Sequence, residues 1–256
     1  MPNTHTLTRE IAVKVPRVIA LFWLIKILST SVGESFADYL NEDLGLGLNK
    51  TALLMSALMC GALVIQVSLK KYVPAVYWST VGMVSITGTL ITDYFTDGLE
   101  IPLITSAAVF SVALAVTFAA WWKQEKTLEM KDINNRSREI FYWVAILFTF
   151  ALGTAVGDLV SEEMGLGYAK TALLAASLIA VFTALWRTQL VSGVLAFWMA
   201  YILTRPLGAS IGDLLTQAPE DGGLGISTSL VSQVFFAAML ASVVYLSITK
   251  IDRIEK

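Results

Sequence analysis

The chain has 256 residues, of which 56% are hydrophobic and only 15% are charged, so it is too apolar for an ordinary soluble domain. Its formal net charge of −2 argues against a nucleic-acid partner bound through bulk positive charge. The single cysteine, Cys60, and the single histidine, His5, exclude a disulfide scaffold and a soft-metal site built from thiolates or imidazoles.

Apolar runs recur along the whole chain, and their length of about 20 residues is what an α-helix needs to cross a bilayer. Residues 1–17 form a polar tail, and no small-residue cleavage site ends the first apolar run, so we expect no removable signal peptide. We predict an all-α integral membrane protein in contact with the lipid bilayer. Its eight spans, in chain order, are 18–40, 50–69, 75–95, 103–122, 140–161, 169–187, 194–216 and 227–248.

Lysine and arginine predict the orientation of these spans, because the cytoplasmic loops of membrane proteins are rich in both. With both termini on one side, 14 of the 18 basic residues lie on that side. Only Lys50 and Lys170 lie in loops on the other side, where eight acidic residues gather. We therefore predict that both termini and the charged loop 123–139 are cytoplasmic.

One motif occurs four times without a gap: an aromatic residue and a Trp, a glycine ten residues after the Trp, and an aspartate fifteen residues after it. The tryptophans are Trp23, Trp78, Trp143 and Trp198; the glycines are Gly33, Gly88, Gly153 and Gly208; the aspartates are Asp38, Asp93, Asp158 and Asp213. The Trp offsets of 55, 65 and 55 residues indicate a duplicated two-helix unit. Units with two spans each enter the membrane in the same direction, so the repeats are parallel and surround the membrane normal. We assign the repeats to 18–71, 72–122, 140–190 and 191–249, with a tail at 250–256.

Four tandem repeats, each with two membrane spans and a repeated Trp, resemble a family of uncharacterised bacterial inner-membrane proteins. The resemblance covers essentially the whole chain. It implies a multi-pass protein of the bacterial inner, or cytoplasmic, membrane, and it implies no particular reaction.

Each odd-numbered span carries a polar face. An α-helix turns 100° per residue, so positions 7, 11, 14, 15 and 18, counted from the Trp of each repeat, share one side of the helix. That side holds most of the hydroxyl groups and nearly all the charges of the odd spans, whereas the even spans are more uniformly apolar. We predict that the odd helices form an inner ring with polar faces inward, and that the even helices face lipid. Each repeat aspartate then lies near the outer end of its helix.

The four aspartates and Glu34 are candidates for a cation pathway. Rings of carboxylates select cations, and oxygen ligands suit hard ions such as Mn²⁺ or Mg²⁺. A small cation, bound as a metal by Asp38, Asp93, Asp158 and Asp213 near the outer mouth, is the functional interpretation. The same aspartates could instead accept hydrogen bonds from the backbone N–H groups that open the following spans. The sequence leaves both interpretations open.

Three charged residues break the repeat, because Lys26, Glu34 and Arg205 stand where the sister repeats have neutral side chains. A charge inside the bilayer costs roughly 2.5–3.5 kcal/mol on insertion scales, so each needs a partner. Glu34 and Arg205 share the inward face and differ in height by about 6 Å. We therefore predict an ion pair between repeats one and four. It serves either as a structural staple or, with Lys26, in coupling transport, and Pro206 predicts a bend beside it.

Two functions remain open. The first is a membrane transporter or channel for a cation; the second is a non-transporting scaffold or regulator that uses loop 123–139. We expect no enzyme and no cofactor, because a nucleophile–base pair, an HExxH motif and a phosphate loop are all missing from the sequence. We interpret the repeat tryptophans as interfacial anchors more readily than as a site for an aromatic-stacked cation, and the repeat glycines as close helix contacts. The ion, the direction and the oligomeric state stay open, a homo-oligomer included.

Overall fold

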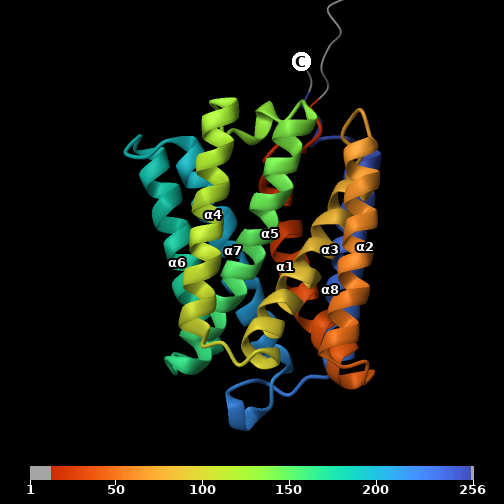
Figure 1. Cartoon of the computed structure of the whole chain (residues 1–256), viewed down its shortest axis with the longest axis vertical. Helices are drawn as coiled ribbons and strands as arrows, with labels where there is room; N and C mark the ends of the chain where they lie inside the picture. The colour runs from red at the N-terminus through yellow and green to blue at the C-terminus, as the bar shows by residue number, and fades with distance from the viewer. Residues whose placement is uncertain (1–12, 255–256) are drawn as a thin grey trace, which may run out of the picture.

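The computed structural model describes residues 13–254, apart from the side chain of Glu42. Most of the predicted tail 1–17 and the last two residues of the tail 250–256 therefore lie outside the described residues. Within that range, eight helices are long and apolar enough to cross a membrane, as predicted, and the protein is a multi-pass membrane protein (Figure 1). They are α1 (Ala20–Asp38), α2 (Leu48–Ser68), α3 (Pro74–Asp93), α4 (Leu103–Glu125), α5 (Arg136–Asp158), α6 (Tyr168–Arg187), α7 (Gly193–Thr216) and α8 (Thr228–Thr249).

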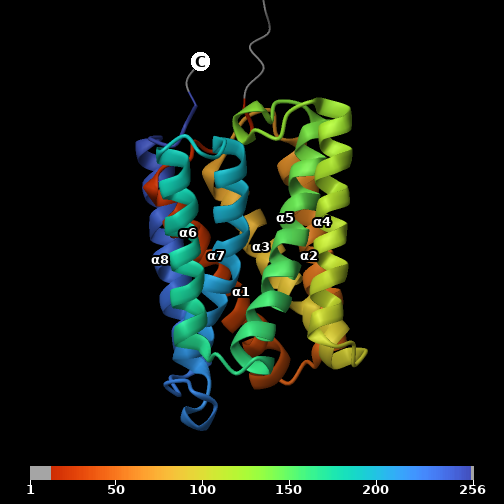
Figure 2. The same ribbon diagram turned by 90° about the vertical axis from the view of Figure 1, so that its left-hand side faces the viewer.

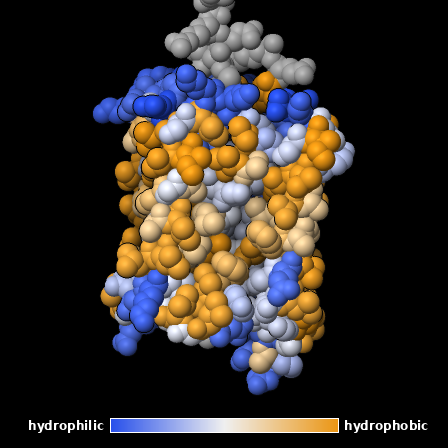
Figure 3. Space-filling view, turned by 90° about the vertical axis from the view of Figure 1, so that its right-hand side faces the viewer, coloured by the Kyte–Doolittle hydropathy of each residue, from blue (hydrophilic) through white to orange (hydrophobic). Residues whose placement is uncertain are grey.

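The two ends of the helix bundle differ in what they carry. Both ends of the described chain and the α4–α5 connection lie at one end, which we call the terminal end (Figures 1 and 2). The repeat aspartates lie at or near the ends of the odd helices at the opposite end, which we call the acidic end. On the face drawn in Figure 3, apolar side chains cover much of the surface between the two ends, as a lipid-facing belt requires.

Three of the inner helices continue beyond their repeat aspartate as a single π-helical turn. These turns are η1 (Tyr39–Asp43), η2 (Tyr94–Gly98) and η4 (Leu159–Glu163). The fourth repeat has no such turn: α7 stays α-helical to Thr216, and the short 3₁₀ segment η5 (Pro219–Asp221) follows. A further 3₁₀ segment, η3 (Met130–Asp132), lies in the α4–α5 connection. Because π-turns are rare and frequently occur at functional sites, three of them at one end indicate the acidic end as a candidate functional site.

The odd helices form a closed ring. Helix α1 packs against α3, α3 against α5, α5 against α7, and α7 against α1. In the apolar 18-residue window of each span, 56–67% of the odd helices is buried, against 11–28% of the even helices, which confirms the predicted inner and outer layers. The even helices pack outside, with α2 on α3, α4 on α5, α6 on α7 and α8 on α1. Each even helix thus covers the odd helix of the next repeat, so the two-helix sequence unit is not the packing unit.

The repeat glycines set the spacing of the ring. A Cβ added at each of them would lie 2.5–2.8 Å from the Cβ of the residue at position 7 of the next repeat. The pairs, glycine first, are Gly33 with Ser85, Gly88 with Phe150, Gly153 with Arg205, and Gly208 with Thr30. No side chain fits in so short a gap, so the prediction of close contacts is confirmed. The four contacts repeat around the ring and close from the fourth repeat to the first, as parallel repeats about one axis require.

Aromatic side chains fill the ring near the terminal end. Trp78, Trp143 and Trp198 are at most 4% exposed, and each packs against aromatic neighbours. The Nε1 of Trp198 donates a hydrogen bond to the carbonyl of Leu128 at 3.0 Å. Interpreting these three residues as interfacial anchors was therefore wrong, since they lie inside the bundle instead of facing lipid headgroups. Trp23 is partly buried against Phe197.

An extended segment at residues 13–19 lies across the terminal end and forms polar contacts with several other elements. The Lys14 ammonium forms a buried ion pair with Glu139 of α5 at 2.6 Å and also donates to the carbonyl of Val67. The backbone N–H groups of Lys14 and Arg17 donate to the carbonyls of Ile133 and Asp252. These contacts join the start of the described chain to α5, to the α4–α5 connection and to the C-terminal segment.

Candidate functional site

A cavity of about 480 Å³ lies at the acidic end, between the four inner helices. All five carboxylates predicted for a cation pathway line it: Glu34, Asp38, Asp93, Asp158 and Asp213. The cavity extends to exposed residues of the acidic end, Asp97 and Glu100. One aspartate comes from each repeat because the motif places it at the same helical position four times.

Three of these carboxylates are especially close together. One oxygen each from Glu34, Asp158 and Asp213 lies within 4.8 Å of the other two. Asp213 is only 6% exposed, and among the described residues its carboxylate makes no hydrogen bond or ion pair. Carboxylates at this separation repel one another unless a cation or a proton lies between them. The guanidinium of Arg205 offsets the charge of Glu34, and the oxygen atoms of all three groups are of the type that hard cations bind.

The structure does not support the capping interpretation for three of the aspartates, Asp93, Asp158 and Asp213. The described hydrogen bonds include none from the first turns of α4, α6 and α8 to Asp93, Asp158 or Asp213. Some of the N–H groups that these side chains were expected to bind already donate to the preceding backbone: those of Thr105 and Ser106 donate to Pro102, and that of Thr171 donates to Gly167. Helix capping therefore does not account for an aspartate at these three places.

One of the lining carboxylates, Glu34, belongs to a buried ion pair. The Nη2 of Arg205, on α7, lies 2.5 Å from the Oε2 of Glu34, on α1, as the helix geometry of the sequence predicted. Arg205 is completely buried and Glu34 is 7% exposed. Glu34 thus contacts Arg205 on one side and lines the cavity on the side towards the acidic end. Helix α7 is continuous from Gly193 to Thr216 with Pro206 inside it, and the bend expected there stays a prediction.

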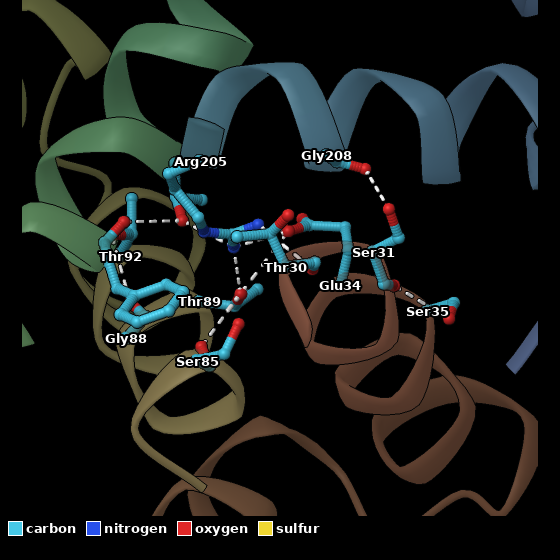
Figure 4. Close-up of polar contacts among 12 residues, drawn as sticks. Thr30, Ser31, Glu34, Ser35, Ser85, Gly88, Thr89, Thr92, Arg205 and Gly208 are labelled. Atoms are coloured by element: carbon cyan, nitrogen blue, oxygen red, sulfur yellow. Dashed lines mark hydrogen bonds and ion pairs between the residues drawn. The ribbon is translucent and has the colours of Figure 1, made fainter. Parts of the chain in front are cut away.

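The guanidinium of Arg205 is hydrogen-bonded to each of the other three repeats. Its Nη2 also donates to the hydroxyls of Thr89 and of Thr154, the latter at 2.7 Å, and its Nη1 donates to the carbonyl of Thr30 at 3.4 Å. Figure 4 shows the side chain reaching from α7 towards Glu34 and Thr89. Glu34, Thr89 and Thr154 occupy the same position, 11, of repeats one, two and three. The guanidinium therefore lies where the pseudo-symmetric inner faces converge.

Lys26 takes no part in this pair. Its ammonium is buried and has no hydrogen-bond partner in the described part of the protein. It lies 3.9 Å from the ring centre of Phe150 and 4.4 Å from that of Tyr201, which places it in two cation–π contacts. Lys26 therefore lies outside the Glu34–Arg205 ion pair with which it was grouped, although Phe150 lies near both cations.

Fully buried aromatic side chains occupy the ring between the terminal end and the level of Arg205 with its bonded partners, which we call the Arg205 layer. They include Tyr77 and Tyr142, whose hydroxyls hydrogen-bond to each other, and Tyr201. The lining of the cavity ends at Glu34. In this conformation the cavity leads from the acidic end to the Arg205 layer, and packed side chains occupy the remainder.

A family model described as a repeat of unknown function, DUF347, matches the chain four times, over residues 21–72, 76–127, 141–189 and 196–252. The chain belongs to the DUF347 family. Each DUF347 match contains one copy of the Trp–Gly–Asp motif, so the family repeat and the motif repeat are the same unit. No curated protein and no solved structure matches the chain.

Within the DUF347 repeats, sequence reasoning missed the role of two residues. Thr89 and Thr154 were placed on the inward face but not in the contact with Arg205. The signal was present, because both align with Glu34, the predicted partner of Arg205. A hydroxyl that also bonds its own helix backbone, as Thr154 does to Phe150, gives no indication of a tertiary partner by itself.

Proposed function

We propose that this DUF347 protein is a membrane transporter for a small cation, and that its substrate is a hard divalent metal such as Mn²⁺ or Mg²⁺. One observation carries the proposal. Five carboxylates from four helices line a single cavity, and one of them, Glu34, is paired with the buried Arg205. Intramembrane carboxylates are costly, so placing one from each repeat in one cavity favours a ligand over a structural role.

The oxygen chemistry supports a hard ion. The close carboxylates Glu34, Asp158 and Asp213 offer several oxygen atoms without sulfur or imidazole, and such ligands suit Mg²⁺, Ca²⁺ and Mn²⁺. Asp38 and Asp93 add charge at the same cavity. Together these groups attract a divalent ion and offset its dehydration.

The filled half of the ring favours a transporter over an open channel. Arg205 and the aromatic side chains beneath it block passage in this conformation, so an ion can cross only after the inner helices rearrange. The bias of basic residues towards the terminal end supports a cytoplasmic location for that end. We accordingly propose that the cavity faces the outside of a bacterial inner membrane.

Flux into proteoliposomes tests the proposal. The purified protein is reconstituted with a metal-sensing dye inside the vesicles, and Mn²⁺ or Mg²⁺ is added outside. Asp158→Asn and Asp213→Asn should each reduce flux at least tenfold. Glu163→Gln is the matched control, because Glu163 is an exposed acidic residue of the same end that does not line the cavity. Equal flux in all variants, or none above empty vesicles in the wild type, would contradict the proposal.

One observation favours the second candidate, a scaffold or regulator without transport. The terminal half of the ring is filled by side chains, as a protein without a pathway would have it. In that case the α4–α5 connection would be the contact surface. The absence of flux together with unchanged stability on removal of the cavity carboxylates would favour this candidate.

A further inference from the structure

The groups around the Arg205 guanidinium form a cage of oxygen atoms, which we call the oxygen cage. Its members are the Glu34 carboxylate, the hydroxyls of Thr89 and Thr154, and the Thr30 carbonyl. Three of these oxygens meet at one nitrogen, Nη2, and the fourth bonds the neighbouring Nη1. Each of the four is an acceptor towards Arg205, and they come from three different inner helices.

The hydroxyls of the oxygen cage are oriented for a cation. Thr154 donates its own hydrogen to the carbonyl of Phe150 at 3.1 Å, and Thr89 has the carbonyl of Ser85 and the Glu34 carboxylate within 3.4 Å. Donation to any of these acceptors leaves the oxygen lone pairs of both hydroxyls free to accept from Arg205. Carbonyl and hydroxyl oxygens arranged around an axis are the ligands with which membrane proteins replace the hydration shell of an ion.

The charge of the oxygen cage matches a monovalent ion. It contains one carboxylate, and the guanidinium that fills it carries one positive charge. A buried charge that is not balanced is strongly unfavourable, so an ion that replaced the guanidinium would need the same single charge. The cavity above, with several carboxylates, suits a divalent ion instead.

One nitrogen of Arg205 is left without a hydrogen-bond partner, and the oxygen cage is next to the cavity. The Nε of Arg205 is buried without a hydrogen-bond partner among the described residues. Glu34 belongs both to the oxygen cage and to the lining of the cavity, so an ion in the cavity already contacts one ligand of the cage. An ion therefore needs no further opening to reach the cage once the arginine side chain withdraws.

We infer that the oxygen cage is a binding site for a monovalent cation, and that the Arg205 side chain occupies it in this conformation as a tethered substitute. Its use in transport rests on the proposed function: the monovalent ion would take the cage when Arg205 withdraws, and it would be the ion coupled to movement of the divalent substrate. Binding to the cage itself does not depend on transport.

Emptying the oxygen cage tests the inference. Arg205→Ala is purified in detergent, and its melting temperature is measured in NaCl, KCl, millimolar guanidinium chloride and choline chloride at equal ionic strength. Na⁺, K⁺ or guanidinium should raise the melting temperature by about 5 °C over choline, as a ligand well above its dissociation constant does. Arg205→Ala/Glu34→Gln lacks the carboxylate and should not respond. The wild type should not respond either, because its cage is full.

Two results would overturn the inference. One is an equal melting temperature of Arg205→Ala in all four salts. The other is failure to obtain folded Arg205→Ala and Arg205→Gln even when guanidinium is present throughout purification, because a true cation cage accepts the free ion in place of the tethered one. Metal flux by the wild type with no salt response in Arg205→Ala would refute the cage site and leave the proposed transport function standing. A salt response of Arg205→Ala without any metal flux by the wild type would refute the transport function and leave the cage site standing.

Discussion

At the scale of single residues, the interior depends on the residues that break the repeat. Arg205 stands where the sister repeats have Thr30, Ser85 and Phe150, and its guanidinium contacts all three other repeats. A symmetric ring cannot place one cation near its axis unless one repeat differs from the others. The partner of Arg205 could be predicted from helix geometry, because a buried charge requires one.

The remaining residues of the site could not be predicted as readily. The hydroxyls of Thr89 and Thr154 bond their own helices as well as Arg205, so their sequence gives no charge-based reason for a tertiary contact. Lys26 is the opposite case. Its charge predicted a polar partner, and aromatic rings were found instead, since a ring face also stabilises an ammonium.

The Glu34–Arg205 pair leads to a stability prediction. Glu34→Gln should lower the free energy of unfolding by about 3–5 kcal/mol, because it leaves the guanidinium buried without its counter-charge. Arg205→Met should have an effect of similar size. The double variant should be more stable than either single variant, because neither charge is then left alone. Thermal unfolding in detergent measures all three, and additive losses in the double variant would show that the two groups do not interact.

At the scale of helices, the eight spans and the inner position of the odd ones follow directly from the distribution of apolar and polar residues. The packing partners of the even helices do not. Their faces are almost uniformly apolar, so nothing in α2 distinguishes α3, against which it packs, from α1, which precedes it. The π-turns after Asp38, Asp93 and Asp158 are also unpredictable, because a single inserted residue changes the backbone without changing composition.

The ring contacts of the glycines predict a position-specific effect. Gly153→Ala should lower the free energy of unfolding by about 1–3 kcal/mol, because the new Cβ would lie 2.5 Å from the Cβ of Arg205 and force two inner helices apart. Gly61→Ala is the matched control, since nothing lies within 4 Å of a Cβ there. It should be neutral or stabilising by up to about 1 kcal/mol, the helix preference of Ala over Gly. Equal losses at both positions would contradict close packing of the ring.

At the scale of the whole molecule, the terminal end should respond to pH. Burial raises the pKa of Asp252, whose carboxylate accepts a hydrogen bond from Tyr72 at 2.5 Å and has one oxygen without a partner among the described residues. The folded protein therefore binds the proton more tightly than the unfolded chain, and its stability falls as the pH rises through the folded pKa. Asp252→Asn should be more stable than the wild type above that pKa, and its melting temperature should depend less on pH than that of the wild type. A parallel shift at every pH would contradict this assignment.

The orientation of the molecule decides which compartment the acidic cavity faces. Basic residues gather at the terminal end, and we therefore expect that end in the cytoplasm. Two exposed residues report on the two ends: Glu100 in the α3–α4 connection and Lys131 in the α4–α5 connection. In a Cys60→Ala background, Glu100→Cys should react with a membrane-impermeant thiol reagent in intact cells, whereas Lys131→Cys should react only after lysis.

A third position links orientation to the cavity. Thr96 lines the cavity at the acidic end, so Thr96→Cys should react from the same side as Glu100→Cys, and more slowly because it is half-buried. Bound Mn²⁺ should slow its reaction further, since the ion lies against the neighbouring carboxylates, and should leave Glu100→Cys less affected. Labelling of Lys131→Cys in intact cells, with none of Glu100→Cys, would show that the molecule has the opposite orientation in the membrane. The cavity would then face the cytoplasm, and a transporter of this structure would load its ion from inside the cell.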